Sequence, residues 1–100
     1  MKNFRTYQIA VEFYHLTRPL RLSSQLNDQL ERAASSVALN LAEGAGRPSK
    51  ADQKRFFGYA FGSAKECQAI LDLASGKTAA MVECADKLAA HIYRLMKCGG

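Results

Sequence analysis

The sequence has no tryptophan, only two prolines and only three cysteines among its 100 residues. The cysteines are odd in number, lie far apart at Cys67, Cys84 and Cys98, and form no CxxC pair, so the sequence predicts neither a disulfide framework nor a cysteine-based zinc site. Free thiols in a reducing compartment are expected instead. Abundant alanine and leucine with so little proline favour helix.

The chain also lacks a long apolar run. No stretch approaches the roughly 20 apolar residues that a membrane helix needs. The N-terminal MKNFRTYQIAVEFYHL includes Glu12 and has no apolar core of the kind found in signal peptides. We therefore expect a cytoplasmic protein without membrane contact. With 48% hydrophobic and 23% charged residues, residues 1–100 are expected to form one globular domain.

Apolar residues recur at helical spacing in four segments, and strand-type alternation persists nowhere. The first segment runs from about Phe4 to Thr17 and ends before Pro19. The limits of the other helices come from capping residues. The second helix is expected to begin after Ser23 or Ser24 and to end at a left-handed glycine cap at Gly44 or Gly46. The third is expected to lie between Ser49 and Gly76, and the fourth to begin after Thr78 and fray at Gly99 and Gly100. Short connections between four helices predict an all-α, antiparallel up-down four-helix bundle.

The third segment has more apolar residues than one helix face needs. Phe57 and Phe61 form a second stripe, and Gly58 and Gly62 lie four residues apart in the helix interior, where each costs about 1 kcal/mol relative to alanine. Two interpretations stay open. Either the monomer buries a broad stripe, or Phe57, Gly58, Phe61 and Gly62 meet another subunit, since such a patch is unusual on a monomer.

Residues with catalytic or metal-binding potential are few. His15 and His91 are isolated, and neither belongs to a pattern such as HExxH. The segment GAGRPSK is not a P-loop, because that motif requires GxxxxGK[ST] between a strand and a helix. Nothing indicates a catalytic Cys–His pair. We therefore expect no enzymatic activity, no metal and no cofactor.

The corner NLAEGAGRPSKADQKRF, residues 40–56, concentrates polar residues between two helices. Asn40, Glu43 and Arg55 are predicted to form a network that fixes this corner, since a buried glutamate needs such a partner. Basic residues are expected to gather at this end of an up-down bundle: Arg47, Lys50, Lys54, Arg94 and Lys97. With a net charge of +5 and the N-terminus of the third helix nearby, they suggest a phosphate-binding surface. The alternative is a solvated charged corner.

Two motifs carry a family resemblance: SQLxxQLxRAASSVxxNLAEGAGRPS, residues 24–49, and RFxxxAxGSAxE, residues 55–66. They resemble the four-helix-bundle family whose founding members are encoded in intervening sequences of bacterial 23S ribosomal RNA genes. The resemblance implies an up-down bundle, a homopentameric ring and no known enzymatic activity. The connection TRPLRLSS looks shorter and more basic than the acidic loop usual in that family.

Accessory proteins of diversity-generating retroelements are similar in fold, and they bind nucleic acid and reverse transcriptase through a basic pentameric barrel. By extension, the expected function is a non-enzymatic oligomer, a pentamer by resemblance, that binds RNA or DNA through a basic surface. The alternative is a protein-interaction scaffold, such as an accessory subunit that binds a partner polypeptide.

Overall fold

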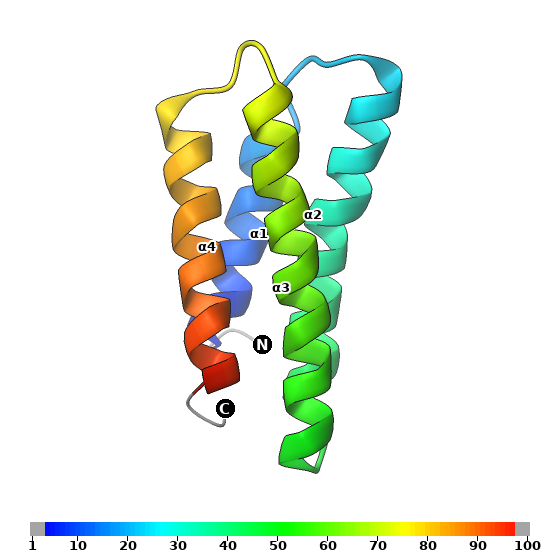
Figure 1. Ribbon diagram of the computed structural model, residues 1–100, viewed down its shortest axis with the longest axis vertical. Helices are drawn as coiled ribbons and strands as arrows, with labels where there is room; N and C mark the ends of the chain where they lie inside the picture. Colours follow the sequence, from blue (N-terminus) through cyan, green and yellow to red (C-terminus); the bar gives the residue numbers. More distant parts are fainter. Residues whose placement is uncertain (1–3, 98–100) are drawn as a thin grey trace.

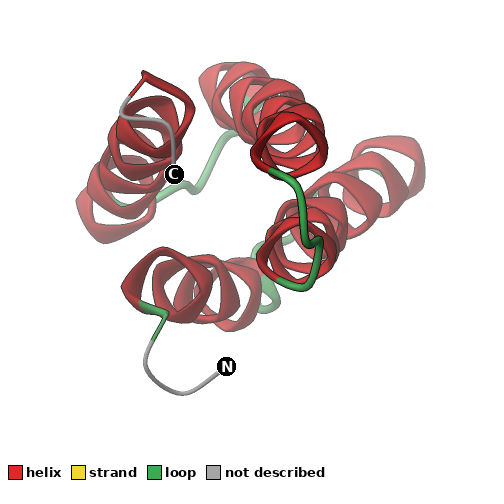
Figure 2. Cartoon of the chain, turned by 90° about the horizontal axis from the view of Figure 1, so that it is seen from below, coloured by secondary structure: helices red, strands yellow, loops and turns green. Residues whose placement is uncertain are grey.

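The computed structural model describes residues 4–97 and folds them into four α-helices (Figure 1). These are α1 (Arg5–Thr17), α2 (Ser24–Ala45), α3 (Lys50–Leu73) and α4 (Ala79–Lys97). Each helix packs against its two neighbours, α1 against α2 and α4, and α3 against α2 and α4. The prediction of an all-α up-down bundle is confirmed, and Figure 2 shows the four helices around a common centre. Cys98, Gly99 and Gly100 lie outside the described residues.

Hydroxyl side chains cap three of the helices as the sequence predicts. The hydroxyl oxygen of Ser23 accepts a hydrogen bond from the backbone N–H of Leu26 at 3.2 Å. Ser49 and Thr78 accept equivalent bonds at the starts of α3 and α4, at 3.1 and 3.2 Å. Each bond satisfies a backbone donor that has no partner within its helix. After α3 the chain turns at Gly76, whose φ of +83° is the one positive φ within residues 4–97.

The end of α2 agrees with the prediction in position but not in conformation. The helix continues through Gly44 to Ala45 and its C-cap is Gly46, one of the two predicted glycines, but the φ of −88° shows that the expected left-handed conformation is wrong. Gly44 has a different role. A Cβ at this position would lie 2.7 Å from Cε1 of Phe57 and 3.2 Å from Cβ of Phe56. The missing side chain therefore lets α3 place its aromatic rings directly against α2.

One apolar core runs along the bundle axis. Its largest fully buried side chains come from all four helices: Ile9, Phe13, Val37, Leu41, Cys67, Leu71, Leu88 and Ile92. Phe57 belongs to this core, since only 4% of it is exposed and its ring centroid lies 6.2 Å from that of Phe4. Burying such a side chain contributes about 1.5–3 kcal/mol. The monomer therefore buries Phe57 itself, which supports the first of the two interpretations for this ring.

The helices differ in length, which shapes one end of the molecule. α2 and α3 have 22 and 24 residues, whereas α1 and α4 have 13 and 19. Figure 1 shows the α2–α3 hairpin extending past the lower ends of α1 and α4. The corner at residues 46–49 is the tip of this projection. No helix of the described chain is long and apolar enough to cross a membrane.

Candidate nucleic-acid interface

Polar residues of the two sequence motifs join α2 to α3 in the middle of the hairpin. The hydroxyls of Ser36 and Ser63 are 2.9 Å apart across the helix pair. The amide of Asn40 donates to the backbone carbonyl of Ser36 at 2.9 Å and to its hydroxyl at 3.0 Å. The Ser36–Ser63 contact joins α2 to α3, whereas both bonds from Asn40 remain within α2. Asn40 therefore orients the Ser36 hydroxyl that contacts Ser63 and has no hydrogen bond to Glu43 or Arg55 among the described residues.

The predicted Asn40–Glu43–Arg55 network is absent from the described residues. Glu43 forms its ion pair with Arg47 at 2.8 Å. Arg55 contacts Asp52 at 3.4 Å and donates to the hydroxyl of Tyr59, also at 3.4 Å. Partners three or four positions away in sequence lie on the same side of a helix, so Arg55 finds them without crossing to α2. The hydrogen bond from Arg55 to Tyr59 is the main cause that raises the pKa of this guanidinium.

The two arginines stack on aromatic rings at the hairpin tip. The guanidinium carbons of Arg47 and Arg55 lie 4.6 and 4.8 Å from the ring centroid of Phe56. Tyr59 packs edge-on against Phe56 and is half exposed. Arg47, Arg55, Phe56 and Tyr59 form what we call the tip cluster. Both arginines face a carboxylate as well as a ring, so much of their charge is locally balanced.

Lys50 and Lys54 differ from these arginines. Both occupy the first turns of α3, both are exposed, and within residues 4–97 neither forms an ion pair. They lie one helical turn apart beside the positive end of the helix dipole. Their charges are therefore available to an anionic partner.

A second basic region lies between α3 and α4. A shallow groove of about 430 Å³ separates the two helices; Phe61, Lys65, Gln68, Asp86, Ala89, Ala90, Tyr93 and Arg94 line it. The rings of Phe61 and Tyr93 have centroids 6.0 Å apart across this α3–α4 groove. The ammonium of Lys97 lies 5.3 Å from the Tyr93 centroid, and that of Lys65 lies 5.9 Å from the Phe61 centroid.

The predicted basic residues therefore divide into two groups. Arg94 shares the α3–α4 groove with Phe61. Phe61 comes eleven residues after Lys50 along α3, which is about 17 Å of helix rise. Lys50 and Lys54 near the tip, and Arg94 and Lys97 beside the groove, occupy the same half of the bundle without forming one compact cluster. Sequence reasoning missed Lys65 and Tyr93, because their proximity depends on how α3 and α4 pack.

Gly58 and Gly62 face open space. No atom lies within 4 Å of a Cβ built at either position. The expected close approach of a helix to these glycines is therefore not made inside the described monomer. Phe61, which was predicted with them as an interface residue, is partly buried against Tyr93 instead.

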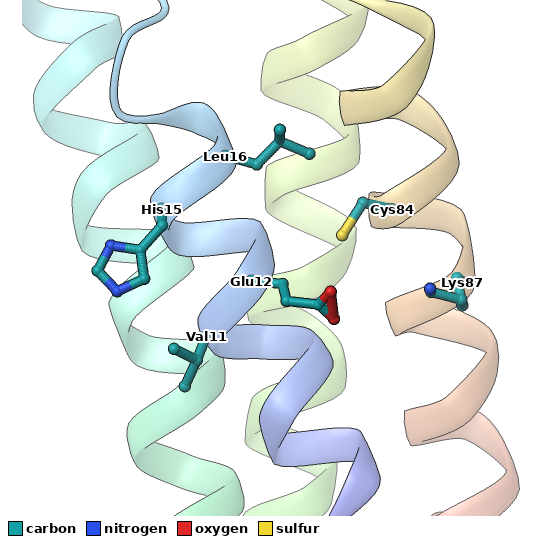
Figure 3. A pocket seen from close by; sticks show the side chains of 6 residues that line it. All are labelled: Val11, Glu12, His15, Leu16, Cys84 and Lys87. Carbon is teal, nitrogen blue, oxygen red and sulfur yellow. The ribbon is translucent and has the colours of Figure 1, made fainter.

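The α1–α4 groove, of about 600 Å³, brings together several residues of potential chemical interest (Figure 3). Its lining includes Glu12, His15, Cys84 and Lys87. Figure 3 shows the imidazole of His15 directed away from the Cys84 sulfur, with Glu12 between them. Burial also raises the pKa of the Cys84 thiol, and it raises that of Cys67 to about 12. Burial therefore disfavours the reactive thiolate form of both cysteines.

Within the described part of the chain, no group of three His, Cys, Asp or Glu residues has the arrangement of a metal site. His91 lies on α4, where burial and then the nearby Arg94 lower its pKa. A cationic neighbour and a depressed pKa favour the neutral imidazole. Among the described residues, the charged groups that influence its pKa are the cations Arg94, Arg5 and Lys87.

Comparison with known proteins gives one result. The family model described as 23S rRNA-intervening sequence protein matches residues 4–98. No curated protein and no solved structure matches the chain significantly. The family match spans all four helices, including α1 and α4, which lie outside the two sequence motifs.

Proposed function

Because the chain belongs to the family of 23S rRNA-intervening sequence proteins, we propose that it is a non-enzymatic bundle that associates with copies of itself and binds RNA or DNA. The proposed contact surface extends from the tip of the α2–α3 hairpin along α3 to the α3–α4 groove. It comprises the exposed cations Lys50, Lys54, Lys65, Arg94 and Lys97.

One observation carries this proposal: among the described residues, the cations of that surface form no ion pair. The ion pairs of the described residues use other arginines, namely Arg5, Arg18, Arg47 and Arg55. After Asp86, the remainder of α4 has three Lys or Arg residues and no acid, and two of the three, Arg94 and Lys97, belong to this surface. Unpaired cations on one surface are the electrostatic requirement for phosphate contacts.

Charge-removal variants test the proposal. A Lys50→Gln, Lys54→Gln, Arg94→Gln, Lys97→Gln variant should lose at least about tenfold in affinity for RNA at 100 mM salt, because each lost phosphate contact reduces counterion release. The matched control removes the same number of charges away from that surface: Arg21→Gln, Arg32→Gln, Lys77→Gln and Lys87→Gln change exposed cations that also have no ion pair among the described residues. Fluorescence anisotropy with labelled RNA gives both affinities. Equal affinity of the four-site variant and wild type would remove these residues from the proposal.

The proposed self-association rests on the outer face of α3. Gly58 and Gly62 each cost about 1 kcal/mol within a helix, and the monomer places nothing against them. A helix of a second copy would use the close approach that glycine allows. The family resemblance suggests a pentamer. Light scattering should give a mass several times 11.0 kDa, and Gly58→Leu with Gly62→Leu should reduce it; a monomeric wild type would contradict this.

A protein-interaction scaffold is the second candidate, favoured by exposed leucines. Leu39 is 68% exposed and borders an apolar groove between α1 and α2 that also includes Val11, Tyr14 and Ala38. Leu73 is 72% exposed at the end of α3. Purification from the native host, with and without nuclease, separates the two functions. A protein that remains bound after nuclease treatment supports the scaffold, whereas loss of the co-purified material supports nucleic acid.

A further inference from the structure

We propose that the α3–α4 groove binds a single-stranded segment of nucleic acid, with a base stacked on the exposed ring of Tyr93, which Phe61 supports from the side at an interplanar angle of 49°. The inference rests on the proposed nucleic-acid function and makes it more specific. It specifies that the nucleic acid is single-stranded, and it assigns the preference for single strands over duplex to the α3–α4 groove.

The first argument is the combination of rings and cations. Tyr93 is 49% exposed although it is aromatic, and its ring lies 6.0 Å from that of Phe61. Lys97 and Lys65 lie near opposite members of this ring pair. Proteins that bind single strands combine aromatic platforms for bases with cations that follow the phosphates. The groove provides both components within a few ångströms.

The second argument is the state of the charges. Lys65, Arg94 and Lys97 form no ion pair among the described residues. The one acidic residue in the groove lining, Asp86, accepts a hydrogen bond from the amide of Gln68 at 2.8 Å. Asp86 also lies two helical turns from Tyr93 along α4. The end of the groove that holds the exposed ring is therefore predominantly positive.

The third argument is a comparison with the tip cluster, which has a similar composition. There the cations Arg47 and Arg55 already stack on Phe56 and pair with acids. Tyr59 is half exposed like Tyr93, but the cation near its ring, Arg55, is paired with Asp52. Lys97 lies 5.3 Å from the Tyr93 centroid and forms no ion pair among the described residues, so its ammonium is free to turn to a phosphate and uncover the ring. A duplex keeps its bases stacked on one another, so it can use the cations but not the ring.

The test compares strands and variants by fluorescence anisotropy. The probes are a 12-nucleotide oligouridine and a 12-base-pair RNA duplex at equal salt. Wild type should bind the single strand more tightly, and Tyr93→Leu should weaken that binding by about 5- to 100-fold, the range for loss of one stacked base. Tyr59→Leu, which removes an equally exposed tyrosine outside the groove, should change it less than twofold. Duplex binding should be insensitive to both substitutions.

A spectroscopic readout complements the affinities. The chain has no tryptophan, so Tyr93→Trp introduces a single indole whose fluorescence should be quenched by oligouridine and not by the duplex. Unquenched fluorescence, or wild-type affinity in Tyr93→Leu, would overturn the groove while leaving binding by the basic surface intact. No binding of either probe by wild type would refute the proposed function itself. A lower mass of Tyr93→Leu in light scattering would assign the groove to a second copy instead, and would also overturn the inference.

Discussion

Gly44 offers a sensitive test of how α2 and α3 pack. In Gly44→Ala, the new methyl group would lie 2.7 Å from a ring carbon of Phe57, which is buried and has little room to move. Overpacking of this kind costs about 1–3 kcal/mol, and the better helix propensity of alanine returns about 1 kcal/mol. We therefore expect the variant to be neutral to about 2 kcal/mol less stable than wild type.

Gly46→Ala is the matched control. Gly46 has an ordinary negative φ of −88°, and the nearest atoms to a Cβ there are backbone oxygens at 3.6 and 3.7 Å. This substitution should be neutral or stabilise by up to about 1 kcal/mol, since alanine restricts the unfolded chain. Urea denaturation followed by circular dichroism measures both variants. If Gly44→Ala proved more stable than wild type, the close contact between Gly44 and Phe57 would be refuted.

Three further predictions concern individual side chains. A double-mutant cycle should give a coupling of up to about 1 kcal/mol between Glu43 and Arg47, as for exposed pairs, and none between Glu43 and Arg55; the reverse would restore the network predicted from sequence. Burial raises the pKa of Cys67 to about 12. In a Cys84→Ser, Cys98→Ser variant, Cys67 should therefore not react with a thiol reagent at pH 8 until the protein is denatured. Rapid labelling of the native protein would contradict the burial of Cys67. The pKa of His91 is lowered from 6.5 in the folded chain, so the unfolded chain binds this proton more tightly. Stability should therefore fall as the pH drops through 6.5. His91→Gln should flatten this part of the curve of stability against pH, and an unchanged curve would count against the shift.

The elements of the fold follow from local sequence signals. The hydroxyl caps Ser23, Ser49 and Thr78 and the apolar spacing between them predict the helices correctly, because caps and helical periodicity are local properties. Short connections then leave few arrangements other than an up-down bundle. The role of Gly44 was missed for the same reason. A glycine near a helix end is usually a cap, and only the packed pair shows that a ring occupies its side-chain space.

The candidate site depends on contacts that sequence spacing does not specify. Arg55 was expected to reach Glu43 across the hairpin, but Asp52 and Tyr59 on its own helix are closer partners. The pairing of Phe61 with Tyr93 joins residues of different helices, so it depends on the register of α3 against α4. The up-down topology was enough to place the basic residues Lys50, Lys54, Arg94 and Lys97 in one half of the bundle. The side-chain positions were needed to show that these residues form no ion pair among the described residues.

The salt dependence of RNA binding tests the central claim most directly, because it counts the phosphate contacts made by unpaired cations. Five such cations on the proposed surface predict a slope of log K against log salt of about −3 to −4 for each chain that contacts a single strand. Removing Lys50, Lys54, Arg94 and Lys97 should bring that slope close to about −1. A wild-type slope near zero, or the same slope in both proteins, would contradict the account.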